Sequence, residues 1–279
     1  MGRISLFSHN VEKMKKSNFV FLIPAVLLPF EANADTNFYL GGTVGHHLYK
    51  ESGYMQQAGY LLGAIVRFQH YGNGNEANLY LNATADYSHK EYSYNGSLVN
   101  MLTSAKSPYE FNGSQVNLGA DAQVGVAFNF YELGDDYWVL FTGSNYKGFD
   151  DSNDKNTDYG HRRIRNSIFW TFGTKYIWKI GGHIITPAVK SGTVVYSRTV
   201  SKKDVDVVYK QKEGSLFEFS VSYEYGYFWL EPYFKYQQFG NSERSVEKVT
   251  LSNGKQIEIE MMEPANITRE LGINIGARF

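Results

Sequence analysis

Acidic and histidine side chains that could hold a metal or activate a water gather in one stretch of the chain. Asp150, Asp151, Asp154 and Asp158 lie close together, and His161 follows the last of them by three residues. Carboxylate oxygens suit calcium, but this spacing lacks the glycine turn and the closing glutamate of an EF-hand loop. A histidine near acids in a polar loop is usually solvated. We therefore predict a solvated loop here and no metal site.

His46 and His47, which stand beside Tyr49, are the second candidate for chemistry. Adjacent residues of a strand point to opposite faces, so at most one of the two rings could join a metal site. The chain has no cysteine, which excludes a disulfide framework, a thiolate metal site and a cysteine nucleophile. We expect no catalytic residue, no metal and no cofactor.

The N-terminal residues have the pattern of an export signal. Three lysines, two of them directly after Met14, precede an apolar run from Phe19 to Phe30, and Ala32-Asn33-Ala34 follows it. A charged segment, an apolar core and a small-x-small site make up a secretory signal peptide. The apolar run has about 12 residues, whereas a membrane-spanning helix needs roughly 20. We expect residues 1–34 to be cleaved and residues 35–279 to form the mature protein, with translation starting at Met14 or at the first methionine.

The mature chain is polar on average but rich in aromatic residues. Removal of residues 1–34 takes away four basic and two acidic side chains and changes the net charge from −1 to −3, which gives no indication of a nucleic-acid partner. The chain has 22 Tyr, 19 Phe and 27 Gly, and its mean hydropathy is −0.37. This profile fits strands that alternate between lipid and a polar lumen. A soluble, secreted β-sandwich shares part of it.

The C-terminal residues favour the membrane alternative. Apolar residues occupy every second position, and small or polar residues fill the gaps: Leu271, Ile273, Ile275, Ala277 and Phe279 alternate with Gly272, Asn274, Gly276 and Arg278. A period of two places the apolar set on one face of a strand. Alternation that runs to a terminal aromatic residue resembles the strand by which bacterial outer-membrane barrels are recognised for insertion. We therefore expect the barrel-assembly machinery, outer-membrane lipid and lipopolysaccharide as partners.

The same alternation predicts ten strands. They are Asn37–Tyr49, Tyr60–Gln69, Asn78–Tyr87, Val116–Phe130, Tyr137–Lys147, Arg163–Trp178, His183–Tyr196, Ser215–Tyr225, Phe228–Gln238 and Ile267–Phe279. Short turns alternate with long polar loops near residues 50–55, 90–114, 148–162, 197–213 and 239–266. The prediction is an all-β, antiparallel transmembrane barrel with short periplasmic turns and long extracellular loops.

The longest loop contains a hairpin signal of its own, Ser252-Asn253-Gly254-Lys255. We expect a β-ribbon that rises above the membrane. If this ribbon crossed the membrane instead, the barrel would have twelve strands. Charged residues in the ribbon, such as Glu247 and Glu258, favour the count of ten.

The inward-facing positions of the predicted strands carry charges of both signs. They include Arg67, Asp121, Gln123, Lys190, Glu218, Glu224, Glu231, Tyr233, Lys235 and Arg278. A ten-stranded barrel is only slightly wider than the eight-stranded case, in which side chains fill the interior. Because an unpaired ion away from water is costly, we expect these charges to pair across the lumen. The lumen is then either plugged or a narrow selective pore.

Ten strands with long outer loops resemble the omptin proteases, which place an Asp pair and an Asp/His pair across a groove at the outer rim. The sequence departs from that pattern, because the loop around 101–112 has no Asp. Asp158 with His161 is the remaining candidate. A phospholipase would need a Ser/His pair on the lipid-facing wall, and no predicted strand shows a His on its apolar face. We expect that the chain is not an enzyme.

The C-terminal residues from Pro232 onward look like the end of the Opc-type adhesins, ten-stranded barrels whose extracellular loops bind host-surface ligands. The similar features are Pro232–Gln237, the Ser252–Gly254 turn, Pro264 and the run from Ile267 to Phe279. Those adhesins bind polyanionic glycans through a basic crevice, and the fourth loop here carries Arg198, Lys202, Lys203, Lys210 and Lys212. The resemblance implies adhesion or ligand recognition, with these five as candidate ligand-binding residues. A narrow porin-like channel is the alternative.

Overall fold

The computed structural model describes most of the predicted mature chain. The described residues are 35–51, 55–72, 77–99, 106–129, 136–152, 162–202, 207–250 and 256–279. The predicted signal peptide lies outside these ranges. Among the described residues, no helix is long and apolar enough to cross a membrane.

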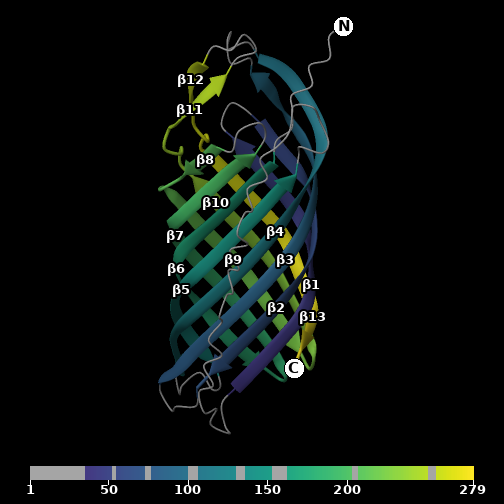
Figure 1. Cartoon of the computed structure of the whole chain (residues 1–279). Coiled ribbons are helices and arrows are strands. Elements are labelled where there is room, and N and C mark those ends of the chain that lie inside the picture. Colours follow the sequence, from purple (N-terminus) through teal and green to yellow (C-terminus); the bar gives the residue numbers. More distant parts are fainter. Residues whose placement is uncertain are drawn as a thin grey trace, which may run out of the picture. The chain divides into compact units, whose positions relative to one another are not determined.

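Nearly all described residues belong to strands (Figure 1). These are β1 (Asp35–Glu51), β2 (Met55–Tyr71), β3 (Ala77–Val99), β4 (Lys106–Asn129), β5 (Tyr137–Ser152), β6 (Arg162–Ile180), β7 (His183–Lys202), β8 (Val207–Lys210), β9 (Gly214–Tyr225), β10 (Phe228–Phe239), β11 (Ser245–Thr250), β12 (Gln256–Met261) and β13 (Asn266–Arg278). Ten of them form a closed antiparallel ring, in which each strand pairs with the next and β13 pairs with β1. The short β8 pairs with β7, and β11 and β12 form a separate sheet. The ten-stranded barrel and its ribbon are confirmed, and the twelve-stranded alternative is wrong.

Ring closure joins the first and last strands of the barrel. Leu40 of β1 pairs with Ala277 of β13. Phe38 and Phe279 exchange two backbone hydrogen bonds, with N···O distances of 3.0 and 2.8 Å. The expected contact of the last strand with the first strand is therefore confirmed. Closure leaves the barrel without an unpaired edge, as a lipid environment requires.

The strand connections differ between the two ends of the barrel. Gly181-Gly182 joins β6 to β7, and the positive φ angles of these residues, 53° and 85°, suit the tight turns that match the twist of a hairpin. Gly226, with a φ of 57°, begins the two-residue turn between β9 and β10. We call this the turn end. At the opposite end, the loop end, lie β8 and the β11–β12 ribbon (Figure 1).

Several strands extend further toward the loop end than the sequence predicts. The expected loop at residues 90–114 is largely a ladder, because β3 continues to Val99 and β4 begins at Lys106. The expected loop at residues 197–213 likewise contains the end of β7 and all of β8. Both predictions are wrong for one reason. Outward-facing residues near the loop end, such as Glu91, are polar, so the apolar alternation stops while backbone pairing continues.

Exposed apolar side chains form a belt around the outside of the barrel. It includes Leu40, Val44, Leu62, Val66, Val124, Leu140, Phe172, Val189, Phe219, Ile273 and Ile275. Among the exposed aromatic residues, Tyr60 and Tyr196 lie toward the loop end of this apolar belt, and Trp138 and Trp178 lie toward its turn end. Soluble monomers rarely expose an apolar surface of this extent. An apolar band flanked by aromatic girdles is typical of barrels that face lipid.

Glycines on the inward face make room for large side chains in the lumen. A Cβ at Gly41 would lie 3.0 Å from Cζ3 of Trp229, and a Cβ at Gly272 would lie 2.5 Å from the hydroxyl of Tyr233. Trp229 and Tyr233 are both buried. Small inward residues on β1 and β13 thus allow β10 to place two aromatic rings inside a narrow ring of strands.

Candidate functional site

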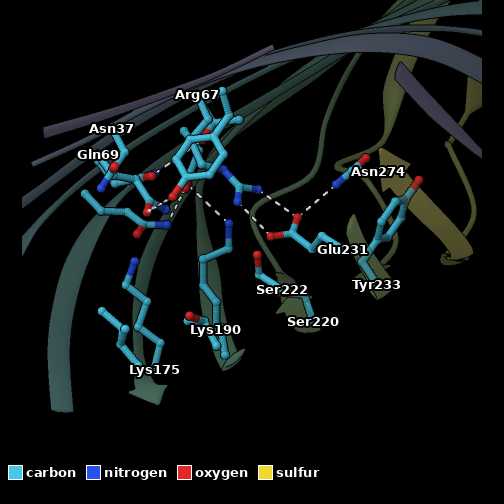
Figure 2. A pocket seen from close by; sticks show the side chains of 18 of the residues that line it. Asn37, Arg67, Gln69, Lys175, Lys190, Ser220, Ser222, Glu231, Tyr233 and Asn274 are labelled. Atoms are coloured by element: carbon cyan, nitrogen blue, oxygen red, sulfur yellow. Dashed lines mark hydrogen bonds and ion pairs between the residues drawn. The ribbon is translucent and has the colours of Figure 1, made fainter. Parts of the chain in front are cut away.

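All ten residues that the sequence places on the inward face line one cavity inside the barrel, part of which Figure 2 shows, and six charged residues among them form the predicted lumen-lining set. They are Arg67, Asp121, Lys190, Glu218, Glu231 and Lys235. They come from five different strands, β2, β4, β7, β9 and β10. Because a ten-stranded ring is narrow, side chains from opposite walls meet inside it.

Arg67 of β2 and Glu231 of β10 form an ion pair across the lumen with two hydrogen bonds. Both guanidinium–carboxylate N···O distances are 2.7 Å. Nδ2 of Asn274 donates a hydrogen bond of 2.9 Å to the same carboxylate, and the guanidinium carbon of Arg67 lies 5.0 Å from the ring centroid of Trp229. Figure 2 shows Asn274 and Arg67 approaching Glu231 from different sides. A buried ion pair stabilises a fold only when its remaining hydrogen bonds are satisfied in this way.

Two further contacts fill the lumen near the turn end. Arg278 lies 3.1 Å from Glu224, which also accepts a hydrogen bond of 3.1 Å from the hydroxyl of Tyr39. Nζ of Lys175 donates a hydrogen bond of 2.8 Å to the hydroxyl of Tyr71. Lys175 is not among the lumen residues predicted from the sequence. Its odd-numbered position, on a strand with apolar residues at even-numbered positions, was the available signal.

A layer of charges crosses the middle of the barrel. Nζ of Lys190 lies 2.6 Å from Glu218 and 3.3 Å from Asp121. Nζ of Lys147, from β5, lies 3.7 Å from Asp86 and 4.0 Å from Glu218. The five side chains come from five strands and form one connected network.

Two cavities flank this charged layer. The cavity toward the turn end measures about 150 Å³, and the one toward the loop end measures about 60 Å³. Asp86, Lys147 and Lys235 line both cavities. Each cavity exceeds the roughly 10–15 Å³ that a single water needs, so both have room for water. The described lumen is therefore divided by charged side chains.

His47, Lys90 and Glu270 form the next layer toward the loop end. Lys90 forms an ion pair with Glu270, and its Nζ lies 3.3 Å from Nδ1 of His47. The ring of His47 is buried, whereas that of His46 is exposed on the outer wall. The two adjacent rings thus lie on opposite faces of β1.

Arg163 and Arg165 of β6 hold the segment that follows β12 in the mouth of the barrel. Nη2 of Arg165 donates a hydrogen bond of 2.9 Å to Glu263, and Arg163 pairs with the same carboxylate and, at 3.0 Å, with Glu51. The backbone carbonyl of Glu263 accepts a hydrogen bond of 2.9 Å from Ser242 N. Both ends of the ribbon segment are thereby fixed at the mouth. The strand pattern of the sequence does not indicate this role for Glu263.

The rim at the loop end offers an open groove and an aromatic cluster. The groove measures about 540 Å³ and is lined by the ends of β1, β2, β3, β10 and β13. The cluster lies on the extended β3–β4 hairpin, where the ring centroid of Phe111 is 4.6 Å from that of Tyr94 and 5.5 Å from that of Tyr109. Burial raises the pKa of Tyr94 above its ordinary value, so this ring is neutral at physiological pH.

The candidate ligand-binding cations do not converge on a crevice. Arg198 and Lys202 belong to β7 and Lys210 belongs to β8, and all three occupy positions that face away from the lumen. Lys212 follows β8 and forms an ion pair of 2.5 Å with Glu243, and hydrogen bonding from Lys212 lowers the pKa of that carboxyl group. Lys203 lies outside the described residues. A single basic loop crevice is therefore not formed by the described members of this set.

The candidates for metal binding and catalysis are separated. Asp150 faces outward and pairs with Arg162, whereas Asp151 is buried and accepts a hydrogen bond of 2.5 Å from Tyr92. Asp154, Asp158 and His161 lie outside the described residues. Among the described residues, no group of three or more His, Asp or Glu side chains could hold a metal ion.

The expectation that no histidine faces the apolar wall is wrong. His46 is exposed on the outer face of β1, with its ring centroid 5.7 Å from that of Tyr60. The residue was overlooked because its strand alternates less regularly than its neighbours. Its register partners are Tyr60 and Leu271, neither of which is a serine.

Solved structures of outer-membrane barrels are similar to this one. The outer-membrane protease OmpT of Escherichia coli matches with a TM-score of 0.53, at 11% sequence identity, over 88% of this chain and 94% of that chain. The chain has the fold of an outer-membrane β-barrel. Identity this low shows the fold alone.

Two smaller similarities have lower scores. Ail, the attachment invasion locus protein of Yersinia pestis, matches at 9% identity over 88% of this chain and 99% of that chain, with a TM-score of 0.30. Neisserial surface protein A matches at 10% identity over 87% and 97% of the two chains, with a TM-score of 0.29. The chain matches no family model and no curated protein sequence.

Proposed function

We propose that this chain is a bacterial surface protein that recognises an extracellular ligand through its loop-end rim, and that it is neither an open channel nor an enzyme. The observation that carries the proposal is the filled lumen. Ion pairs between strands that are not neighbours in the ring cross it, namely Arg67 with Glu231, Lys190 with Asp121, and Lys90 with Glu270. A barrel with a filled lumen offers its environment only its outer wall and its ends.

The proposed location is the outer membrane, with the loop end outside the cell. Support comes from the apolar belt, the aromatic girdles and the closed ring, which together match a lipid-spanning barrel. Short turns at one end and long connections at the other are typical of a periplasmic and an extracellular side, respectively. The rim groove and the β3–β4 hairpin then face the medium.

The rim has the features of a recognition surface. A groove of about 540 Å³ lies beside strands that are fixed by ladder pairing, and Glu263 holds the ribbon segment in place. Tyr94, Tyr109 and Phe111 offer rigid aromatic surface with hydroxyl groups, a combination that is enriched at binding interfaces. Sites on strands hold their geometry better than sites on loops.

Planar-bilayer recording tests the filled lumen. Refolded protein, shown to be folded by heat-modifiable gel mobility, is expected to insert without a steady single-channel conductance. A steady conductance would contradict the proposal and support the narrow-channel alternative.

A glycan array with neutral and anionic glycans tests recognition by the rim. Replacement of Tyr94 and Tyr109 by Ala, or deletion of residues 245–261, is expected to reduce binding at least about tenfold, since buried aromatic contacts dominate interfaces. The deletion spares Ser242 and Glu263, which anchor the segment. A matched control replaces Ser93 and Asn112, a hydrogen-bonded pair on the outer face of the same hairpin, by Ala. Equal binding by all variants, or no binding by the wild-type protein, would count against the proposal.

A further inference from the structure

The outer wall of β7 and β8 carries cations beside the aromatic border of the apolar belt. Arg198 of β7 and Lys210 of β8 are register partners, and both are exposed. Two residues before Arg198, Tyr196 is 47% exposed. Lys202 lies on the same face as Arg198, about 13 Å further along the strand. This wall faces away from the lumen, so these cations are not part of the filled interior.

Charge balance on this wall is uneven. Arg162 of β6 is paired with Asp150, and Lys212 is paired with Glu243. Within the described part of the chain, Arg198, Lys202 and Lys210 form no such ion pair, and Glu243, the partner of Lys212, is the carboxylate that also interacts electrostatically with Lys210. Like charges directly opposite each other on adjacent strands destabilise a sheet. The Arg198–Lys210 pair therefore favours an external anion.

We propose that Arg198 and Lys210, with Lys202 beyond them, bind the phosphate groups of an anionic lipid of the surrounding outer leaflet. Guanidinium and ammonium groups are the usual donors to phosphate. A lipid fits better than a soluble anion because exposed Val195 and Tyr196 continue the same face toward the belt, where acyl chains would pack. The headgroup would then meet the cations, and the chains would meet the apolar surface.

The short strand β8 has a specific role in this arrangement. It pairs only with the loop-end part of β7, from Arg198↔Lys210 to Ser201↔Val207. Without β8, Arg198 would have no cationic neighbour across the ladder. The strand thus builds a two-cation site at one height on the wall. This inference concerns the outer wall and goes beyond the recognition proposed for the rim.

Native mass spectrometry of the protein in uncharged detergent micelles tests the site. The probe is purified rough-type lipopolysaccharide, with its enzymatically dephosphorylated form as the comparison. Wild-type protein is expected to retain the phosphorylated lipid and to bind the dephosphorylated form at least about tenfold more weakly, since the charge-assisted bonds to phosphate are then lost. The double variant Arg198→Gln/Lys210→Gln is expected to lose affinity for the phosphorylated lipid by a similar factor.

A matched control removes the same two charges elsewhere on the exposed surface, in the variant Lys50→Gln/Arg244→Gln. It is expected to bind within about twofold of wild type, because long-range charge effects are screened by salt. Equal losses in both double variants would overturn the proposal in favour of general electrostatic attraction. Displacement of the lipid by an equal concentration of inorganic phosphate would show a soluble-anion site and would also overturn it. If the double variant does not fold, the single variant Lys210→Gln is measured instead, and unchanged affinity would reject the site.

Discussion

Individual residues in this barrel are constrained chiefly by the partner that each finds across the lumen. Arg67 and Glu231 are 164 residues apart in the sequence, yet they form a two-pronged ion pair with Asn274 as a third member. Both side chains are largely buried. A buried pair of this kind contributes modestly relative to a well-packed apolar pair, but removal of one member leaves an uncompensated charge.

At this scale, Arg67→Met is expected to destabilise the barrel by about 3–5 kcal/mol, because Glu231 is left buried and unpaired. The double variant Arg67→Met/Glu231→Gln is expected to recover part of that loss. Urea unfolding in detergent, followed by tryptophan fluorescence, measures both, since Trp229 lies against Arg67. If the single variant lowers the free energy of unfolding by less than about 1 kcal/mol, Glu231 is protonated or hydrated when Arg67 is absent.

The elements at the loop end are held by tertiary contacts more than by their own ladders. The β11–β12 ribbon is a two-stranded sheet, which is marginally stable alone. Its anchor is Glu263, which is bound by Arg163 and Arg165. A second ion pair within the ribbon, between Arg244 and Glu260, is exposed and therefore worth little.

Glu263→Gln is expected to loosen the segment around the ribbon without unfolding the barrel. Limited proteolysis of refolded protein, read by mass spectrometry, should show cleavage between residues 240 and 265 that is faster than in wild type, since local opening sets the rate. The matched control is Glu260→Gln, the same substitution in the exposed pair, which should cleave at close to the wild-type rate. Equal cleavage of the two variants would mean that the mouth contacts do not hold the ribbon.

At the scale of the whole molecule, the lumen is divided where Asp86, Lys147 and Lys235 border both cavities. In the described part of the chain, these three side chains lie between the two cavities. The triple variant Asp86→Ser/Lys147→Ser/Lys235→Ser is expected to join the two cavities and to produce a measurable ion conductance in planar bilayers. Wild-type protein inserted under the same conditions is the reference. If the triple variant shows no conductance, ion flow is blocked at another layer of side chains, such as that of Arg163 and Glu263.

The sequence was sufficient to predict the ring of ten strands, but not which side chains contact each other inside it. Alternation along each strand predicts that Arg67 and Glu231 face inward, because one face must be apolar for lipid. It does not predict which strands place them opposite each other, since the register and tilt of ten strands decide that. The ion pairs of Glu263 with Arg163 and Arg165 could not be predicted for the same reason, because Arg163 lies 100 residues away in the chain.

Strand ends were predictable only within the apolar belt. Beyond it, the outward face of β3 carries Glu91 and Ser93, and the apolar signal disappears while the ladder continues to Val99. β8 also lacks a clear apolar alternation, so the sequence did not predict this strand, and Lys210 was assigned to a loop. The candidate cations were therefore identified by residue type, but their place on the outer wall required the structure.

The contact between Phe38 and Phe279 also constrains the order in which the protein matures. The first strand of the ring can complete its hydrogen bonding only with the last, β13, so β1 keeps an open edge throughout synthesis. Open edges of this kind promote aggregation, and pairings that distant in sequence form slowly. The ring can therefore close only after β13 is available.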